Sequence, residues 1–429
     1  MMKMMLSPRV GISPLSRSMS SHLQPPLLMA AVPGLRVVDF NRPNVLNALN
    51  AEMVGTLLPL LSDWQQTGGD VKMIVLRGTG ERSFCAGGDL MFLHQCATSE
   101  KGLRPSDALA MCAAESVLDY LLHSSRPPVV ALLDGITMGS GAGLSVHGAF
   151  RVATENTLFA MPETGIGFYP DVGSSYFLPR LRLRGQPPPL PSSPSPVGMF
   201  LGLTGARLSG RDAVHAGIAT HFVPSHRLEP LEGMLAEFAQ QACTLNSEVD
   251  HGTLSTAIES LGGFGAEEEE GAEAATGGGG GGGGSFLKKH ERSISECFSL
   301  DSLDAILDAV RCEAARERER GGGQLAHDLE ATSSSSSSSR LDGQQLGAGS
   351  GAAAGGGGGW AVQAEKELER ASPTSLAVTF ELLKRGAALP DLWSCLCLEH
   401  TVAANYFATH PPPPPPPPPV TTTADRVVP

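Results

Sequence analysis

The feature that most constrains this fold is a repeated succession in which a short run of branched apolar residues leads into a glycine-rich turn. Apolar runs at residues 37–40, 73–76 and 129–133 are typical of β-strands. Between the first two, apolar side chains recur at three- and four-residue spacing from Leu46 to Trp64, which predicts an amphipathic helix of about five turns. Strands that alternate with helices favour an α/β architecture for the dense part of the sequence, from about residue 34 to 238.

Low-complexity tracts interrupt the 429-residue chain, which contains 51 glycines and 33 prolines. Such tracts cannot bury enough apolar surface to offset their ordering entropy, so we interpret them as flexible inserts. They lie at residues 186–196, 267–270, 277–284, 333–339, 355–359 and 411–419.

The C-terminal third is expected to be helical between these inserts. Helices are predicted at residues 300–311 and 372–384, the second with Ser372 as N-cap and Pro373 at its first position. We therefore divide the chain into a leader, a catalytic core, a helical C-terminal region and a proline-rich tail, at residues 1–32, 33–240, 241–407 and 408–429.

The leader is basic and free of acidic residues as far as residue 38, with Lys3, Arg9, Arg17 and Arg36 among several serines. This composition is typical of an organelle transit peptide. It does not by itself distinguish a mitochondrial from a plastid destination.

The net charge of −13 disfavours binding to a phosphate backbone, so we expect no nucleic-acid partner. No apolar stretch is long enough to predict a membrane span. The eight cysteines lack the spacing of a zinc site, which favours reduced thiols in an intracellular compartment and predicts no metal centre.

Three glycine-rich turns carry the candidate chemistry, at residues 83–89, 135–144 and 161–173. Glycine lets a ligand approach the backbone closely, and two N–H groups from separate turns can form an oxyanion hole. Glu163 and Asp171 flank the third turn, where two carboxylates can divide roles in activating and orienting reactants. A single glycine turn is most often only a turn. Leu144 also breaks the dinucleotide-binding glycine pattern, and no serine nucleophile elbow is present.

Taken in order, the turns and their flanking segments resemble the 3-hydroxyisobutyryl-CoA hydrolase branch of the enoyl-CoA hydratase/isomerase (crotonase) superfamily. The resemblance is dense over about residues 34–235 and looser over 286–407. It is carried by the segments NRP (41–43), LNAL (46–49), FCAGGD (84–89), GITMG (135–139), LSVHG (144–148), FRVATE (150–155), FAMPET (159–164), PDVG (170–173), YFLPRL (176–181) and AGIATHFV (216–223).

The resemblance implies a spiral of ββα repeats, completed by a helical C-terminal region. It also implies hydrolysis of the thioester of 3-hydroxyisobutyryl-CoA in valine breakdown. By the matching motifs, the backbone N–H groups of Gly88 and Ser140 would form the oxyanion hole. Glu163 would be the catalytic glutamate, acting as nucleophile or as general base. Asp171 would handle the substrate hydroxyl and assist hydrolysis, and Glu115 would contact the substrate.

The same resemblance implies a small-molecule acyl-CoA substrate, no separate cofactor, since CoA is part of that substrate, and a mitochondrial rather than plastid location. It leaves the oligomeric state open. The hydratases of the superfamily carry a second glutamate where this chain has Gly143, which favours a hydrolase.

Two departures from the family pattern keep other functions open. Ser140 stands where this branch has glycine, which would cause strain if its φ were positive. After residue 400, the chain continues into its proline run instead of the family's terminal segment, a difference expected to affect the CoA pocket or the stability. The alternatives are an enoyl-CoA hydratase or another short acyl-CoA enzyme of this fold, and a catalytically inactive CoA-binding paralogue.

Overall fold

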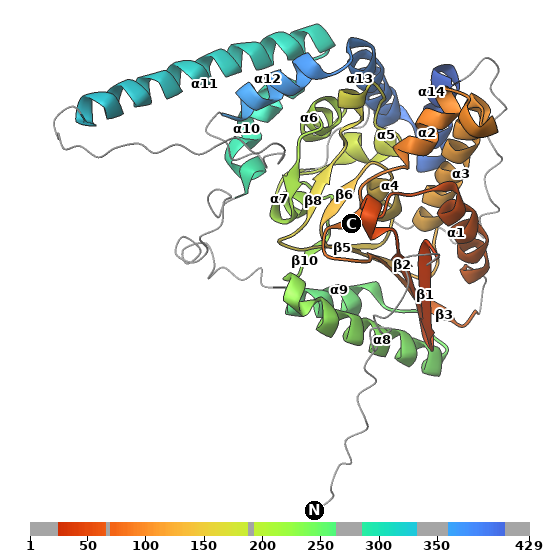
Figure 1. Cartoon of the computed structure of the whole chain (residues 1–429). Helices are drawn as coiled ribbons and strands as arrows, with labels where there is room; N and C mark the ends of the chain where they lie inside the picture. The colour runs from red at the N-terminus through yellow and green to blue at the C-terminus, as the bar shows by residue number, and fades with distance from the viewer. Residues whose placement is uncertain (1–24, 66–68, 188–192, 263–284, 333–358, 408–429) are drawn as a thin grey trace, which may run out of the picture.

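The computed structural model describes residues 25–65, 69–187, 193–262, 285–332 and 359–407 (Figure 1). The predicted inserts at residues 267–270, 277–284, 333–339 and 411–419 lie outside the described residues, as do most of the predicted leader and the tail from residue 408. In the part that is described, no helix is both long and apolar enough to cross a membrane.

The larger sheet has six strands in the order β1-β2-β3-β5-β7-β10, with β1 antiparallel to β2 and the other neighbours parallel. Its strands are β1 (Leu27–Val32), β2 (Gly34–Phe40), β3 (Val71–Gly78), β5 (Val129–Leu133), β7 (Phe150–Ala153) and β10 (His221–Phe222). β1 falls inside the predicted leader of residues 1–32, and that boundary is wrong at its end. Residues 27–32 pair with 35–40 across a tight turn at Gly34, whose φ is +79°.

The smaller sheet has four strands in the order β4-β6-β8-β9, parallel except for β9. These strands are β4 (Ser83–Cys85), β6 (Ile136–Met138), β8 (Leu158–Ala160) and β9 (Leu208–Ser209). In each of the pairs β3-β4, β5-β6 and β7-β8, the first strand joins the larger sheet and the second joins the smaller sheet. This confirms the predicted spiral of ββα repeats.

The α-helices of the described residues cover both faces of the larger sheet and build the C-terminal region (Figure 1). They are α1 (Ala51–Trp64), α2 (Leu90–Ala97), α3 (Pro105–His123), α4 (Ser140–Val146), α5 (Ser174–Phe177), α6 (Pro196–Thr204), α7 (Gly210–His215), α8 (Leu228–Leu245), α9 (His251–Leu261), α10 (Phe286–Phe298), α11 (Leu303–Thr332), α12 (Trp360–Arg370), α13 (Pro373–Ala388) and α14 (Leu392–Phe407).

The larger sheet is buried on both faces, which explains why its strands are continuous apolar runs and not alternating ones. In β3, Ile74 and Leu76 pack with the side chains of α1 and α3. Met73 and Val75 face the other way and pack with α8 and α9. A third core cluster joins the smaller sheet to α6, α10, α12 and α13, so the C-terminal helices are integral to the fold.

Helix ends follow local capping signals, and these correct the predicted ranges. α1 begins at Ala51, and not at Leu46, because the Asn50 side chain accepts a hydrogen bond from the Met53 N–H (2.9 Å) and Leu46 adopts a left-handed conformation. α13 has the predicted cap, with Ser372 accepting from the Ser375 N–H. The predicted insert at 186–196 contains Ser195, which instead caps α6.

Candidate active site

Three of the predicted site residues follow adjacent parallel strands of the smaller sheet. Gly88 comes after β4, Ser140 after β6, and Glu163 after β8, where it opens the 3₁₀ helix η3 (Glu163–Ile166). Because the carboxyl ends of parallel strands meet at one edge of a sheet, these three residues converge although the chain separates them widely.

The Gly88 N–H points away from the backbone of Leu49, which lies beside it. Leu49 and Gly88 form a parallel bridge, in which the Leu49 N–H donates to the Gly87 carbonyl and the Asp89 N–H donates to the Leu49 carbonyl, each at 2.9 Å. In a parallel bridge the residue between those two contacts presents its own N–H to the opposite side. Ser140 lies close to Gly88, since a Cβ atom at Gly88 would be 3.3 Å from Ser140 Oγ.

The Ser140 N–H is the first of helix α4 and so has no acceptor within that helix. The turn before it depends on Gly139, whose φ of 50° and ψ of −120° suit glycine. Ser140 itself has a negative φ, so its side chain causes no left-handed strain. The strain considered from the sequence at position 140 is therefore absent, because the preceding glycine adopts the unusual conformation.

Glu163 lies against this turn. A Cβ atom on Gly139 would be 3.0 Å from Glu163 Oε1, so the carboxylate occupies the space that a side chain at position 139 would need. Burial, followed by the negative charge of Asp171 and then that of Glu115, raises the pKa of Glu163 to about 8. Among the described residues, Glu163 Oε2 has no hydrogen-bond partner. One oxygen of this carboxyl is thus buried without a hydrogen bond to the described residues.

Glu115 and Asp171 complete the predicted set. Glu115 comes from α3, and burial raises its pKa to about 8, followed in size by the charge of Asp171, while a hydrogen bond with Ser140 opposes the rise. Burial also raises the pKa of Asp171 to about 7. The structure therefore brings Gly88, Ser140 and all three predicted carboxylates into one site.

Two further buried carboxylates adjoin this site and were missed in the sequence. Asp119 lies one turn after Glu115 on α3, and neither of its oxygens has a partner among the described residues. Burial raises its pKa well above the usual value, with smaller contributions from Glu115, Asp171 and Glu399. Glu399 comes from α14, and burial raises its pKa to about 7. We call these five side chains the carboxylate cluster: Glu115, Asp119, Glu163, Asp171 and Glu399.

Asp119 lies next to Gly143, the position at which the hydratases of the superfamily carry a second glutamate. A Cβ atom on Gly143 would be 2.9 Å from Asp119 Oδ1 and 2.7 Å from Val172 Cβ. Position 143 therefore has no room for a longer side chain, and the nearest carboxylate comes from α3 instead.

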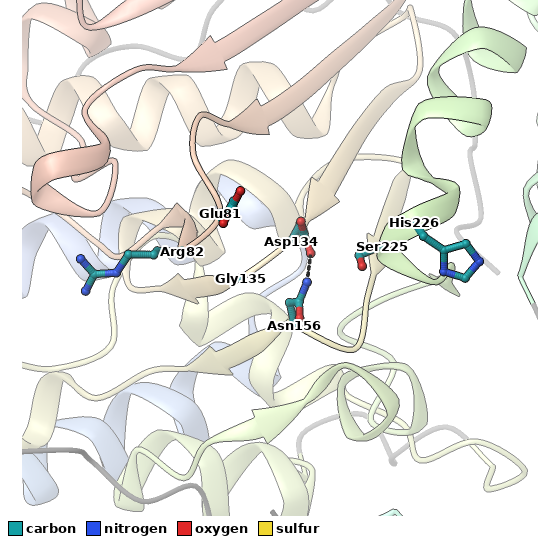
Figure 2. Close-up of a pocket in the computed structure, with 7 residues that line it drawn as sticks. All are labelled: Glu81, Arg82, Asp134, Gly135, Asn156, Ser225 and His226. Atoms are coloured by element: carbon teal, nitrogen blue, oxygen red, sulfur yellow. Dashed lines mark hydrogen bonds between the residues drawn. The ribbon is translucent and has the colours of Figure 1, made fainter. Parts of the chain in front are cut away.

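A separate polar pocket of about 600 Å³ opens at the other end of the smaller sheet (Figure 2). Four of its residues immediately precede β4 or β6, whereas Gly88 and Ser140 follow those strands. Asn156 donates a hydrogen bond to Asp134 (3.1 Å) within it. It is lined by Glu81, Arg82, Asp134, Gly135, Asn156, Ser225 and His226, and so contains none of the carboxylate cluster.

Comparisons with known proteins agree with this architecture. A sequence model of the enoyl-CoA hydratase/isomerase family matches residues 35–352. Among solved structures, a carnitinyl-CoA dehydratase from Mycobacterium thermoresistibile is similar, with a TM-score of 0.62 and 27% identity, over 90% of this chain and 87% of that one.

Two curated relatives carry different names. The small ribosomal subunit protein mS47 of Neurospora crassa is 34% identical over 396 residues, which cover 90% of this chain and 63% of that protein. A mitochondrial 3-hydroxyisobutyryl-CoA hydrolase of Xenopus tropicalis is 33% identical over 369 residues, covering 86% of this chain and 74% of that protein. The chain thus spans less than two thirds of the length of the Neurospora protein.

Proposed function

Because the chain belongs to the enoyl-CoA hydratase/isomerase family, we propose that it hydrolyses the thioester of 3-hydroxyisobutyryl-CoA to 3-hydroxyisobutyrate and CoA, in mitochondrial valine breakdown. The observation that carries the proposal is the position of Glu163 beside the turn that presents the Ser140 N–H, with Gly88 across from it. A carboxylate next to two backbone donors suits acyl transfer at a carbonyl carbon.

In this proposal the thioester oxygen accepts hydrogen bonds from the N–H groups of Gly88 and Ser140. Negative charge develops on that oxygen in the tetrahedral intermediate, where a fixed donor contributes about 3–4 kcal/mol of stabilisation. Glu163 in its ionised form either attacks the carbonyl carbon or removes a proton from the attacking water. The carbon–sulfur bond then breaks, and the CoA sulfur leaves and takes up a proton. Where Glu163 has attacked, water then hydrolyses the anhydride between the acyl group and Glu163, which releases the acid and restores the carboxylate.

Asp171 and Glu115 would bind the substrate beside the reacting carbon, Asp171 at the hydroxyl group. Their pKa values of about 7 and about 8 make each able to exchange a proton near neutral pH. CoA is part of the substrate in this scheme, which uses no separate cofactor.

Hydrolysis is favoured over hydration by the surroundings of Gly143. Addition of water to an enoyl-CoA by the hydratases of this family uses a second glutamate at this position. Here Asp119 and Val172 occupy the space that such a side chain would enter. The location in mitochondria is supported by the names of relatives such as the Xenopus enzyme.

The test is thiol release from 3-hydroxyisobutyryl-CoA by the full chain, with hydration of crotonyl-CoA measured in parallel. Glu163→Gln should abolish thiol release and leave the fold intact by circular dichroism. Glu381→Gln is the matched control, because Glu381 is exposed on α13 and pairs with Arg385 at the surface. Hydration without thiol release would favour a hydratase, and full activity of Glu163→Gln would remove Glu163 from the mechanism.

The similarity to the Neurospora ribosomal protein favours a second candidate, a component of a ribosomal small subunit. The net charge of −13 disfavours direct contact with RNA, so such a role would depend on protein contacts. Sedimentation of the chain with small subunits from its source, resistant to high salt, together with no turnover of any acyl-CoA, would favour this candidate over the hydrolase.

A further inference from the structure

The carboxylate of Glu399 receives hydrogen bonds from the segment that follows Asp171. Oε2 accepts from the Gly173 N–H at 2.8 Å, and Oε1 accepts from the Ser175 N–H at 2.8 Å and from the Ser175 hydroxyl at 2.6 Å. Glu399 lies more than 220 residues after Gly173 and Ser175 in the chain. Glu399 is 2% exposed, so these contacts are shielded from bulk solvent.

The segment held in this way has a backbone conformation that local sequence disfavours. Val172 has a φ of 52°, which is rare for a β-branched residue, and Gly173 follows with a φ of 80°. Such conformations persist only where surrounding contacts enforce them. The contacts are the hydrogen bonds to Glu399 and that between the His147 ring and the Val172 carbonyl (2.8 Å).

α14 is anchored to the same region through its backbone. The Tyr169 hydroxyl donates to the Glu399 carbonyl at 2.9 Å. Residues on both sides of Asp171 are therefore bonded to one residue of the C-terminal helix. No hydrogen bond joins the side chains of Asp171 and Glu399, so Glu399 holds Asp171 through the backbone, while the negative charges of the two carboxylates repel each other.

We propose that Glu399 is a positioning residue, which holds residues 170–175 so that the Asp171 carboxylate faces the reacting groups. This inference rests on the proposed function in that Asp171 is taken as a site residue. It adds a role for α14, which would fix the geometry of the site through the hydrogen bonds of Glu399.

The decisive variant is Glu399→Gln, which keeps the size of the side chain. An amide has one acceptor oxygen and one NH₂ group, so it cannot accept from both Gly173 and Ser175. We expect kcat for thiol release to fall about 10- to 100-fold with KM changed much less, because the reacting geometry is lost while the CoA portion still binds. Glu381→Gln should match the wild type in both constants.

Ser175→Ala removes one of the three donors and leaves Glu399 in place, so it tests the proposal even if Glu399→Gln does not fold. We expect a smaller fall in kcat, again without a matching rise in KM. Wild-type kcat in Ser175→Ala, together with wild-type exchange in the segment that follows Asp171, would overturn the proposal.

Hydrogen–deuterium exchange of the full chain, in the absence of substrate, measures how firmly the segment around Asp171 is held. Glu399→Gln should speed exchange in peptides covering residues 169–177, while peptides from β3 and β5 keep the wild-type rate. Faster exchange in this segment with unchanged kcat, or equal exchange everywhere, would overturn the proposal. If the wild type releases no thiol, the proposed function fails, and local exchange alone then decides whether Glu399 holds the loop.

Discussion

Gly139 and Glu163 are matched across the site: the glycine leaves open the space into which the carboxylate extends, with Oε1 only 3.0 Å from where a Cβ atom on residue 139 would lie. The same glycine adopts the conformation that begins α4 at Ser140. Gly139 therefore determines both the direction of the Ser140 N–H and the position of the Glu163 carboxylate.

Gly139→Ala should consequently lower kcat for thiol release by about 100-fold or more. The methyl group would displace Glu163 and would also strain the turn by about 1–3 kcal/mol. Gly165→Ala is the matched control, because Gly165 lies in the same 3₁₀ helix as Glu163 and nothing lies within 4 Å of its added methyl group. Equal kcat values for the two variants would contradict the proposed fit.

Ser140→Pro tests the backbone donor directly. Proline is tolerated at the first position of a helix and has no N–H. The ψ of −120° at Gly139 mirrors the extended range of residues that precede proline. We expect kcat to fall about 10²- to 10³-fold, as for loss of one oxyanion-hole donor. Ser140→Gly keeps the N–H and should retain much more activity, so similar kcat values for both variants would argue against the donor role.

The carboxylate cluster should make the protein less stable as pH rises toward 8. The pKa values of Glu115 and Glu163 are raised to about 8, and those of Asp171 and Glu399 to about 7. Between pH 5 and these values the folded chain binds protons that the unfolded chain has released. The free energy of unfolding therefore falls with pH, by up to about 1.4 kcal/mol per pH unit for each such group.

Urea unfolding at pH 5.5, 6.5 and 7.5 measures this dependence. Glu115→Gln should reduce the slope, and Glu381→Gln should not, because Glu381 is exposed. Equal slopes in the wild type and in Glu115→Gln would show that Glu115 titrates as an ordinary solvated carboxylate does, because such a group is fully ionised in both states over this range.

Asp119→Asn should stabilise the protein, and more so at high pH. Neither oxygen of Asp119 has a partner in the described part of the chain, and burial raises its pKa well above the usual value. Asparagine has nearly the same size but carries no titrating group. We expect its advantage over the wild type to grow by about 1 kcal/mol or more from pH 6 to pH 8. An advantage independent of pH, measured by urea unfolding, would indicate that Asp119 is already ionised.

Much of the fold followed from local patterns. The apolar run at residues 129–133 is β5, and Ser372 caps α13 as expected, because strand runs and helix caps are encoded by neighbouring residues. The order of the glycine-rich turns also indicated the family, and the structure brings the turn residues Gly88, Ser140 and Glu163 to one edge of the smaller sheet.

Tertiary structure alone decided which other carboxylates lie beside these three turn residues. In the sequence, Asp119 and Glu399 are acidic residues on amphipathic helices, where such residues usually face solvent. Nothing near either residue in the chain indicates its burial. Packing of α3 against α14 places both beside residues 163–175, and the hydrogen bonds of Glu399 span more than 220 residues. Local sequence determines the period and ends of an element, whereas the partners of a buried charge depend on how distant elements pack.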